Sequence, residues 1–249
     1  MPPYNLSPAI IEISGSELRK IAALLSERQE VREDPKTVLI GGWAVDAYNP
    51  YLGSQDIDLV TDNETRQWLI DRLARNEGYT PHIQYPSDTV KKVTPHGEII
   101  LDIIYREIPY PFEGDPEIPF TFNILNGNTV FRNIRGGARI PVPNRSILVL
   151  LKLKAAWDRS YRLIHQRSRD PSQERIKVIK DYADVLALID PAYGGREIDL
   201  EILGAQISRF TFLKELILRI PNLGDVRERY QRMTQQDIRR LCEDFESIL

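Results

Sequence analysis

The sequence predicts an α/β domain over residues 1–143, followed by an α-helical C-terminal domain over residues 144–249. In residues 1–143, short apolar or alternating segments, which are typical of strands, are interspersed with amphipathic helical segments. After residue 143 the spacing of apolar residues is helical throughout. The expected helices there are residues 147–161, 172–189, 199–219 and 234–248. A chain of 249 residues is long enough for two modest domains with cores of their own.

The composition excludes several classes of protein. A hydrophobic share of 42% and a charged share of 28% are those of a folded chain rather than a disordered one. No apolar run approaches the roughly 20 residues that cross a bilayer, and the N-terminus lacks the features of a signal peptide. We therefore expect a soluble cytoplasmic protein with no membrane partner. The single cysteine, Cys242, excludes a disulfide framework, and three separated histidines argue against a histidine-rich metal site.

Local patterns define the elements of the first domain. A helix is expected over residues 14–25, because Ser14 and Glu17 have the spacing of a capping box. A second helix is expected over residues 63–76, with Thr61 or Asn63 as its N-cap. The expected strands are residues 38–40, 56–60, 89–93 and 98–105, with shorter pieces at 120–124, 129–131 and 138–142.

Three acids carry the chemistry that the residues themselves suggest. Asp56 and Asp58 are two apart on an expected strand, so they point to the same face. Two adjacent carboxylates repel unless a cation lies between them, and a divalent metal with oxygen ligands meets that need. Asp102 lies in an otherwise apolar strand, where an acid requires a partner or a metal. Two metal ions held by these three acids could activate a hydroxyl and stabilise a leaving pyrophosphate.

A glycine pair precedes the acids. Gly41 and Gly42 follow the strand at residues 38–40 and open a short helical segment. Glycine lets a phosphate approach the backbone closely, and amides at a helix start can bind it. Trp43, which follows directly, has two interpretations, core packing or base stacking.

The order of these elements resembles that of the DNA polymerase β-type nucleotidyltransferase superfamily. A strand leads to Gly41-Gly42 and a short helix, then comes the strand with Asp56-Ile57-Asp58, and later the strand with Asp102. The resemblance implies a mixed sheet in the catalytic domain and an enzyme that transfers a nucleoside monophosphate from an NTP to a hydroxyl. It also implies Mg²⁺ as cofactor, in a two-metal site. Asp56, Asp58 and Asp102 would then be catalytic and metal-binding, while Gly41, Gly42 and Ser54 would bind the nucleotide. Leu52 stands where many relatives have an arginine.

The second half resembles AbiEii-like nucleotidyltransferases, the toxin halves of toxin–antitoxin systems. Residues 142–155 are similar to the segment after the catalytic sheet of that group, and residues 180–184 match its later (R/K)DxxD element. The resemblance implies that Lys152, Lys180, Asp181 and Asp184 bind the nucleotide or support its site. It also implies tRNA or another RNA as the acceptor, and a cognate antitoxin as a partner.

Two alternatives remain open. The heptad over residues 41–47, Gly-Gly-Trp-Ala-Val-Asp-Ala, is similar to the opening motif of aminoglycoside and lincosamide nucleotidyltransferases, which adenylylate antibiotic hydroxyls. The acceptor would then be a small molecule. The third hypothesis is a catalytically idle scaffold of the same fold, against which the three retained acids argue.

A basic stretch in the helical domain bears on the choice of acceptor. Its members are Arg159, Arg162, Arg167, Arg169, Arg175 and Lys177. Such a stretch is either a solvated pair of helices with their loop or a surface for RNA phosphates.

Overall fold

The computed structural model describes residues 7–28, 35–82, 89–117 and 119–248, which divide into two compact units. Unit 1 is formed from Met1–Pro109 and Thr121–Asn144, and unit 2 from Tyr110–Phe120 and Arg145–Leu249. The sequence analysis places one boundary at residue 143. In the structure, residues 110–120 group with the helical unit, although they precede that boundary.

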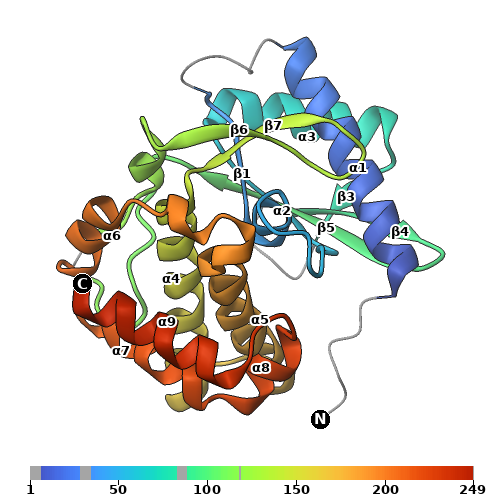
Figure 1. Ribbon diagram of the computed structural model, residues 1–249. Helices are drawn as coiled ribbons and strands as arrows, with labels where there is room; N and C mark the ends of the chain where they lie inside the picture. The colour runs from blue at the N-terminus through green and yellow to red at the C-terminus, as the bar shows by residue number, and fades with distance from the viewer. Residues whose placement is uncertain (1–6, 29–34, 83–88, 118, 249) are drawn as a thin grey trace. The chain divides into compact units, whose positions relative to one another are not determined.

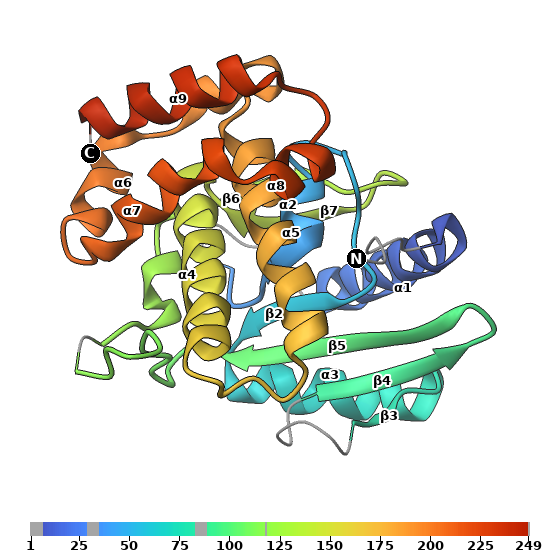
Figure 2. The ribbon, with the colours of Figure 1, turned by 90° about the horizontal axis from the view of Figure 1, so that it is seen from below.

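Unit 1 contains the predicted mixed sheet. Its five strands are β1 (Val38–Ile40), β2 (Ile57–Thr61), β3 (Thr80–Pro81), β4 (Thr89–Thr94) and β5 (Gly97–Tyr105). They lie in the order β1-β2-β5-β4-β3, with β2 and β5 parallel and the other neighbours antiparallel. Figure 2 shows β4 and β5 side by side as a long hairpin. A separate antiparallel ribbon consists of β6 (Thr129–Asn133) and β7 (Arg139–Pro143).

Three helices accompany these strands, α1 (Pro8–Glu27), α2 (Gly41–Asp46) and α3 (Asn63–Asn76). The helix expected at residues 63–76 is confirmed, but its N-cap is Asp62, whose carboxylate accepts the N–H of Thr65. The capping box expected at Ser14 is wrong. Because Ser7 caps α1 and Pro8 opens it, Ser14 lies in the middle of the helix.

The ribbon region differs from expectation at one point. The sequence predicts a short strand at residues 120–124, whereas Phe122–Leu125 forms a 3₁₀ helix that buries Phe122 and Leu125. Beside the ribbon, Arg19 of α1 donates a hydrogen bond of 3.1 Å from Nη1 to the carbonyl of Arg135. This bond joins α1 to the loop between β6 and β7, which lie next to each other in Figure 1.

The core of unit 1 follows the alternation of the two central strands. Ile57 and Leu59 of β2 are fully buried, as are Ile99 and Leu101 of β5. Alternation directs the intervening residues to the opposite face of the sheet. The same pattern that builds the apolar core therefore presents polar residues of β2 and β5 together on the other face.

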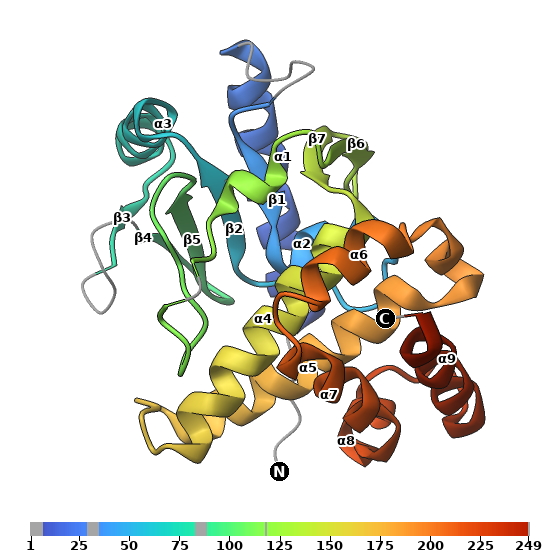
Figure 3. The same cartoon turned by 90° about the vertical axis from the view of Figure 1, so that its left-hand side faces the viewer.

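Unit 2 is helical, as predicted. Its helices are α4 (Arg145–Ile164), α5 (Pro171–Ile189), α6 (Leu200–Ile207), α7 (Phe212–Arg219), α8 (Gly224–Arg229) and α9 (Gln235–Ile248). The long helices α4 and α5 pack side by side (Figure 3). The single helix expected over residues 199–219 is wrong, because the chain turns after Ile207. At this turn it buries Phe210 against Phe112.

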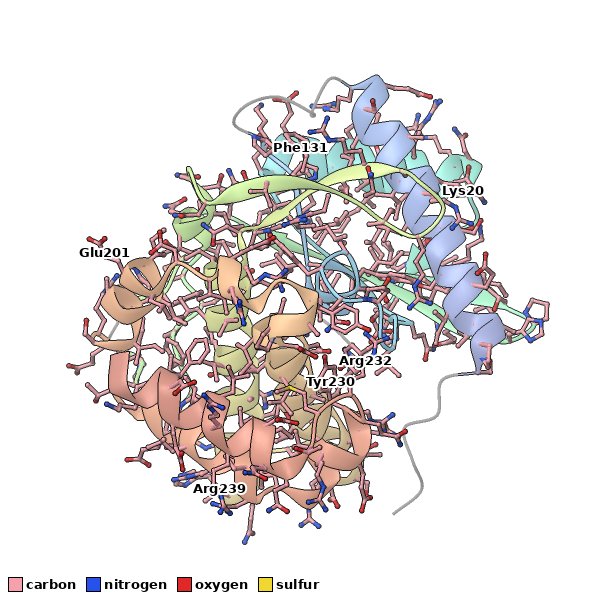
Figure 4. The ribbon with its side chains drawn as sticks, in the orientation of Figure 1. Lys20, Phe131, Glu201, Tyr230, Arg232 and Arg239 are labelled. Carbon is pink, nitrogen blue, oxygen red and sulfur yellow. The ribbon has the colours of Figure 1, made fainter. Side chains whose placement is uncertain are left out.

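A buried polar contact also joins the C-terminal ends of α5 and α8 within unit 2. Tyr230, labelled in Figure 4, is fully buried, and its hydroxyl donates to the carboxylate of Asp190 at the end of α5. Across the described ranges, none of the helices combines the length and the apolar character that crossing a membrane requires.

Candidate functional site

Asp58 and Asp102 lie directly opposite each other on the neighbouring parallel strands β2 and β5. Paired residues on such strands point to the same face of the sheet. Both acids are half-buried, while the residues on either side of them in the strands belong to the buried core. The register therefore brings two of the three predicted acids together.

Asp56 lies just before this pair. The sequence predicts a strand from residue 56, but β2 begins at Ile57, and Asp56 occupies a bend at its entrance. Asp56 is half-buried and two residues from Asp58. Asp56 therefore lies outside the sheet ladder that pairs Asp58 with Asp102.

Gly41 makes the closest approach to these acids. It adopts a φ of +69°, which side-chain-bearing residues rarely adopt, and its strand neighbour Ile40 pairs with Asp58. A Cβ atom built on Gly41 would lie 1.8 Å from Oδ2 of Asp58. The carboxylate therefore occupies the space that any other residue at position 41 would fill.

Asp102 is oriented from the other side by β4. Its carboxylate oxygen Oδ1 accepts a hydrogen bond of 2.7 Å from the hydroxyl of Thr89, which pairs with it in the antiparallel ladder. The sequence does not predict a role for Thr89, because the register between β4 and β5 cannot be derived from the residues of either strand alone. A single threonine at the start of a strand carries no signal that would have identified it.

The carboxylate oxygens of these acids are the kind of ligand that a hard divalent cation prefers. Mg²⁺ prefers carboxylate oxygens, and the parallel register holds two of them on one face with the glycine turn beside them. Within the part of the chain that the structure describes, however, no three His, Cys, Asp or Glu side chains are grouped as a ready metal site.

The remaining predicted nucleotide-binding residues of unit 1 are Gly42 and Ser54. Gly42 is buried within α2. Ser54 is also buried, with 5% of its surface exposed. Their contacts with a nucleotide stay predictions.

Asp46, for which the sequence suggests no role, forms an ion pair. Its two carboxylate oxygens accept bonds of 2.8 Å and 2.6 Å from Nε and Nη2 of Arg135. The Asp46 side chain is 2% exposed. Since Asp46 ends α2, this bidentate pair anchors the helix that begins at Gly41 to the ribbon loop.

The four predicted residues of unit 2 come together in a buried cluster between α4 and α5. Nζ of Lys152 lies 2.6 Å from Oδ2 of Asp184 and 3.4 Å from Oδ1 of Asp181. Lys180 reaches the same Oδ2 of Asp184 at 2.9 Å, and Arg159 pairs with Asp181. All four predicted residues are less than one-tenth exposed. Charges of opposite sign thus meet inside the helical unit, and the predicted nucleotide contacts remain untested.

Two members of the basic stretch are engaged in the same way. Arg159 pairs with Asp181, and Arg162 binds Glu174 through Nε at 2.8 Å and Glu113 through Nη1 at 3.2 Å. Ion pairs within unit 2 therefore account for two of the six members of the basic stretch without RNA.

Comparisons with known proteins give matches among solved structures. Neither the family models nor the curated proteins match the chain. The chain is similar to the lincosamide antibiotic adenylyltransferase LnuA in a lincomycin-bound crystal structure, with 20% identity and a TM-score of 0.41. That similarity covers 70% of this chain and 96% of LnuA. It is also similar to the antibiotic-resistance factor ANT(2'')-Ia in a solution structure, with 16% identity and a TM-score of 0.46. Here 82% of this chain and 97% of that chain are covered.

The contact between Gly41 and Asp58 predicts different outcomes for two glycine substitutions. Gly41 and Gly127 share a φ of +69°, but nothing lies within 4 Å of a Cβ built on Gly127. Gly127→Ala should therefore lose only the conformational term, about 1 kcal/mol of unfolding free energy. Gly41→Ala should lose about 1–3 kcal/mol more, because the methyl group displaces the carboxylate. Urea denaturation of the two variants measures the difference, and equal losses would contradict the contact.

The cluster between α4 and α5 predicts a stabilising role for Lys152. Lys152→Met should lower the unfolding free energy by about 3 kcal/mol, since it leaves buried carboxylates short of one partner. The control is Arg219→Met, which removes an exposed pair with Glu215 and should cost less than about 1 kcal/mol. Equal losses in chemical denaturation would contradict the structural role of Lys152 and favour its predicted contact with nucleotide.

Proposed function

We propose that this protein is a metal-dependent nucleotidyltransferase, which moves a nucleoside monophosphate from an NTP to an acceptor hydroxyl. Asp56, Asp58 and Asp102 are the proposed catalytic and metal-binding residues. Gly41 and Gly42 are proposed to lie along the triphosphate.

The observation that carries the reaction class is the pairing of Asp58 with Asp102, with Gly41 pressed against Asp58. Two carboxylates on one face repel each other, and a cation bound between them offsets this repulsion. Gly41 has no side chain, so the Asp58 carboxylate and the backbone of the turn lie in direct contact. Acids for a metal and a turn for a phosphate thus lie next to each other.

Each residue has a distinct role in the proposed reaction. When bound by the three acids, Mg²⁺ supplies positive charge against the triphosphate, and the acids have enough oxygens for two ions. Asp102 accepts the proton of the acceptor hydroxyl, and Thr89 keeps its carboxylate oriented for this. The hydroxyl oxygen then bonds to the α-phosphorus, the bond to pyrophosphate breaks, and pyrophosphate leaves.

For the acceptor we propose a small-molecule hydroxyl, as in antibiotic adenylylation. The RNA-directed interpretation depends on the (R/K)DxxD element and on the basic stretch. Lys152, Asp181 and Asp184 have ion-pair partners within unit 2, and so do Arg159 and Arg162. Their side chains therefore have an explanation without RNA. The heptad over residues 41–47 is similar to the motif of aminoglycoside and lincosamide nucleotidyltransferases, and this similarity supports a small-molecule acceptor. Within the heptad, Asp46 pairs with Arg135 and Trp43 bonds to Ser14.

The test is transfer of label from each α-³²P-labelled NTP with Mg²⁺ present. Lincomycin and a panel of aminoglycosides are offered as acceptors in one arm, and total tRNA in the other. We expect label on a small molecule. Asp58→Asn and Asp102→Asn should each lower the rate about 100-fold or more, since they remove a metal ligand and a proton acceptor.

The matched control is Asp71→Asn, which changes an exposed acid on α3 paired only at the surface with Arg75. It should transfer label at the rate of the unchanged protein. Label on tRNA would assign the acceptor to RNA and renew the case for an antitoxin partner. Transfer that survives Asp58→Asn, or no transfer to any acceptor, would count against the proposed reaction and favour the idle scaffold.

A further inference from the structure

A buried chain of hydrogen bonds connects α2 with the peptide that precedes Asp56. The indole N–H of Trp43 donates to Oγ of Ser14 at 3.0 Å. The hydroxyl of Ser14 donates in turn to the carbonyl of Gln55 at 2.8 Å. Trp43 is 1% exposed and Ser14 is fully buried, so the bond between them is shielded from water, while the bond to Gln55 is part-buried.

The carbonyl of Gln55 belongs to the peptide unit that ends at Asp56. A peptide unit is planar, so a bond to its oxygen restricts the direction in which the chain enters Asp56. This matters here because Asp56 lies in a bend outside the sheet ladder, where strand pairing does not hold it. Ser14 therefore supplies an orientation that the sheet does not.

Gln55 is held at its other end as well. Its side-chain amide donates to the carbonyl of Glu98 at 2.5 Å, and Glu98 belongs to β5, the strand of Asp102. The residue before Asp56 is thus attached to α1 through its backbone and to β5 through its side chain. Both attachments lie within unit 1.

Close backbone approaches allow α1 to reach this turn. A Cβ built on Gly15 would lie 3.1 Å from the ring of Trp43, and one built on Gly53 would lie 2.6 Å from Ile11. Gly53 also has a φ of +78°. Small residues on both sides therefore bring the turn between α2 and β2 against α1, within reach of the Ser14 hydroxyl. The burial of Trp43 also leaves its ring unavailable for stacking on a base.

We propose that Trp43 and Ser14 are positioning residues, which orient the carboxylate of Asp56 for a divalent cation through the carbonyl of Gln55. The proposal rests on the function proposed above. It explains the tryptophan next to Gly41 and Gly42, because the indole N–H couples the short helix that these glycines open to the first acid of the site. Neither residue touches the metal or the substrate.

The test is the affinity for Mn²⁺ without nucleotide, measured from the electron paramagnetic resonance signal of the free ion. Ser14→Ala removes the hydroxyl, and Trp43→Phe removes the indole N–H while keeping an aromatic ring. Each should weaken Mn²⁺ binding about three- to tenfold, the effect expected when one hydrogen bond of ordinary strength is lost. The double variant should be little weaker than Ser14→Ala, since both changes break one chain.

The matched control is Thr37→Val. It removes another buried hydroxyl contact of unit 1, the 2.7 Å bond between Thr37 and Thr61. It should lower the melting temperature about as much as Ser14→Ala, yet leave Mn²⁺ affinity unchanged. If Ser14→Ala does not fold, Trp43→Phe carries the test alone.

Asp56→Asn separates failure of this proposal from failure of the proposed function. If Asp56→Asn binds Mn²⁺ as the unchanged protein does, the metal site itself is wrong. If Asp56→Asn loses binding while Ser14→Ala and Trp43→Phe keep it and lose only stability, the positioning role is overturned and the metal site stands.

Discussion

The carboxylate of Asp58 rests against the α-carbon of Gly41, and the other features of unit 1 depend on that contact. It requires glycine at the end of β1, because a Cβ would occupy the place of the oxygen. It also requires the register in which Ile40 faces Asp58. On the other edge of β2, the parallel register with β5 brings Asp58 opposite Asp102. A one-residue slip of β2 would send the acid into the apolar core and an isoleucine or leucine to the turn.

Around this contact, side-chain hydrogen bonds hold Asp102, the end of α2 and the entrance of β2. Thr89 holds Asp102, the bidentate pair of Asp46 with Arg135 holds the far end of α2, and Gln55 connects the entrance of β2 to β5. The partners in these bonds belong to β4, β5 and the ribbon loop, three separate parts of unit 1. Contacts from several elements thus fix the strands and turns that carry the acids.

Local patterns in the sequence are sufficient to predict the mixed α/β unit, the helical unit, the Asp56 and Asp58 pair and the glycine turn. Contacts distant in sequence are not predictable in this way. The spacing of Ser14 from Glu17 predicts a helix cap, although the helix begins at Pro8 and the hydroxyl serves Gln55. The element at residues 180–184 matches a family motif, yet Lys180 and Asp184 are also spaced to pair with each other on a helix, as they do. Their local spacing is the same for both uses.

The proposed chemistry requires that the three acids hold a divalent cation beside the glycine turn. A crystal structure with Mn²⁺ and a non-hydrolysable NTP analogue, with the manganese located by its anomalous signal, would show whether they do. We predict manganese within about 2.0–2.4 Å of carboxylate oxygens of Asp56 and Asp58, with Asp102 joining a second ion, and phosphates along Gly41 and Gly42. Manganese bound elsewhere, with these acids coordinating nothing, would contradict the proposed site.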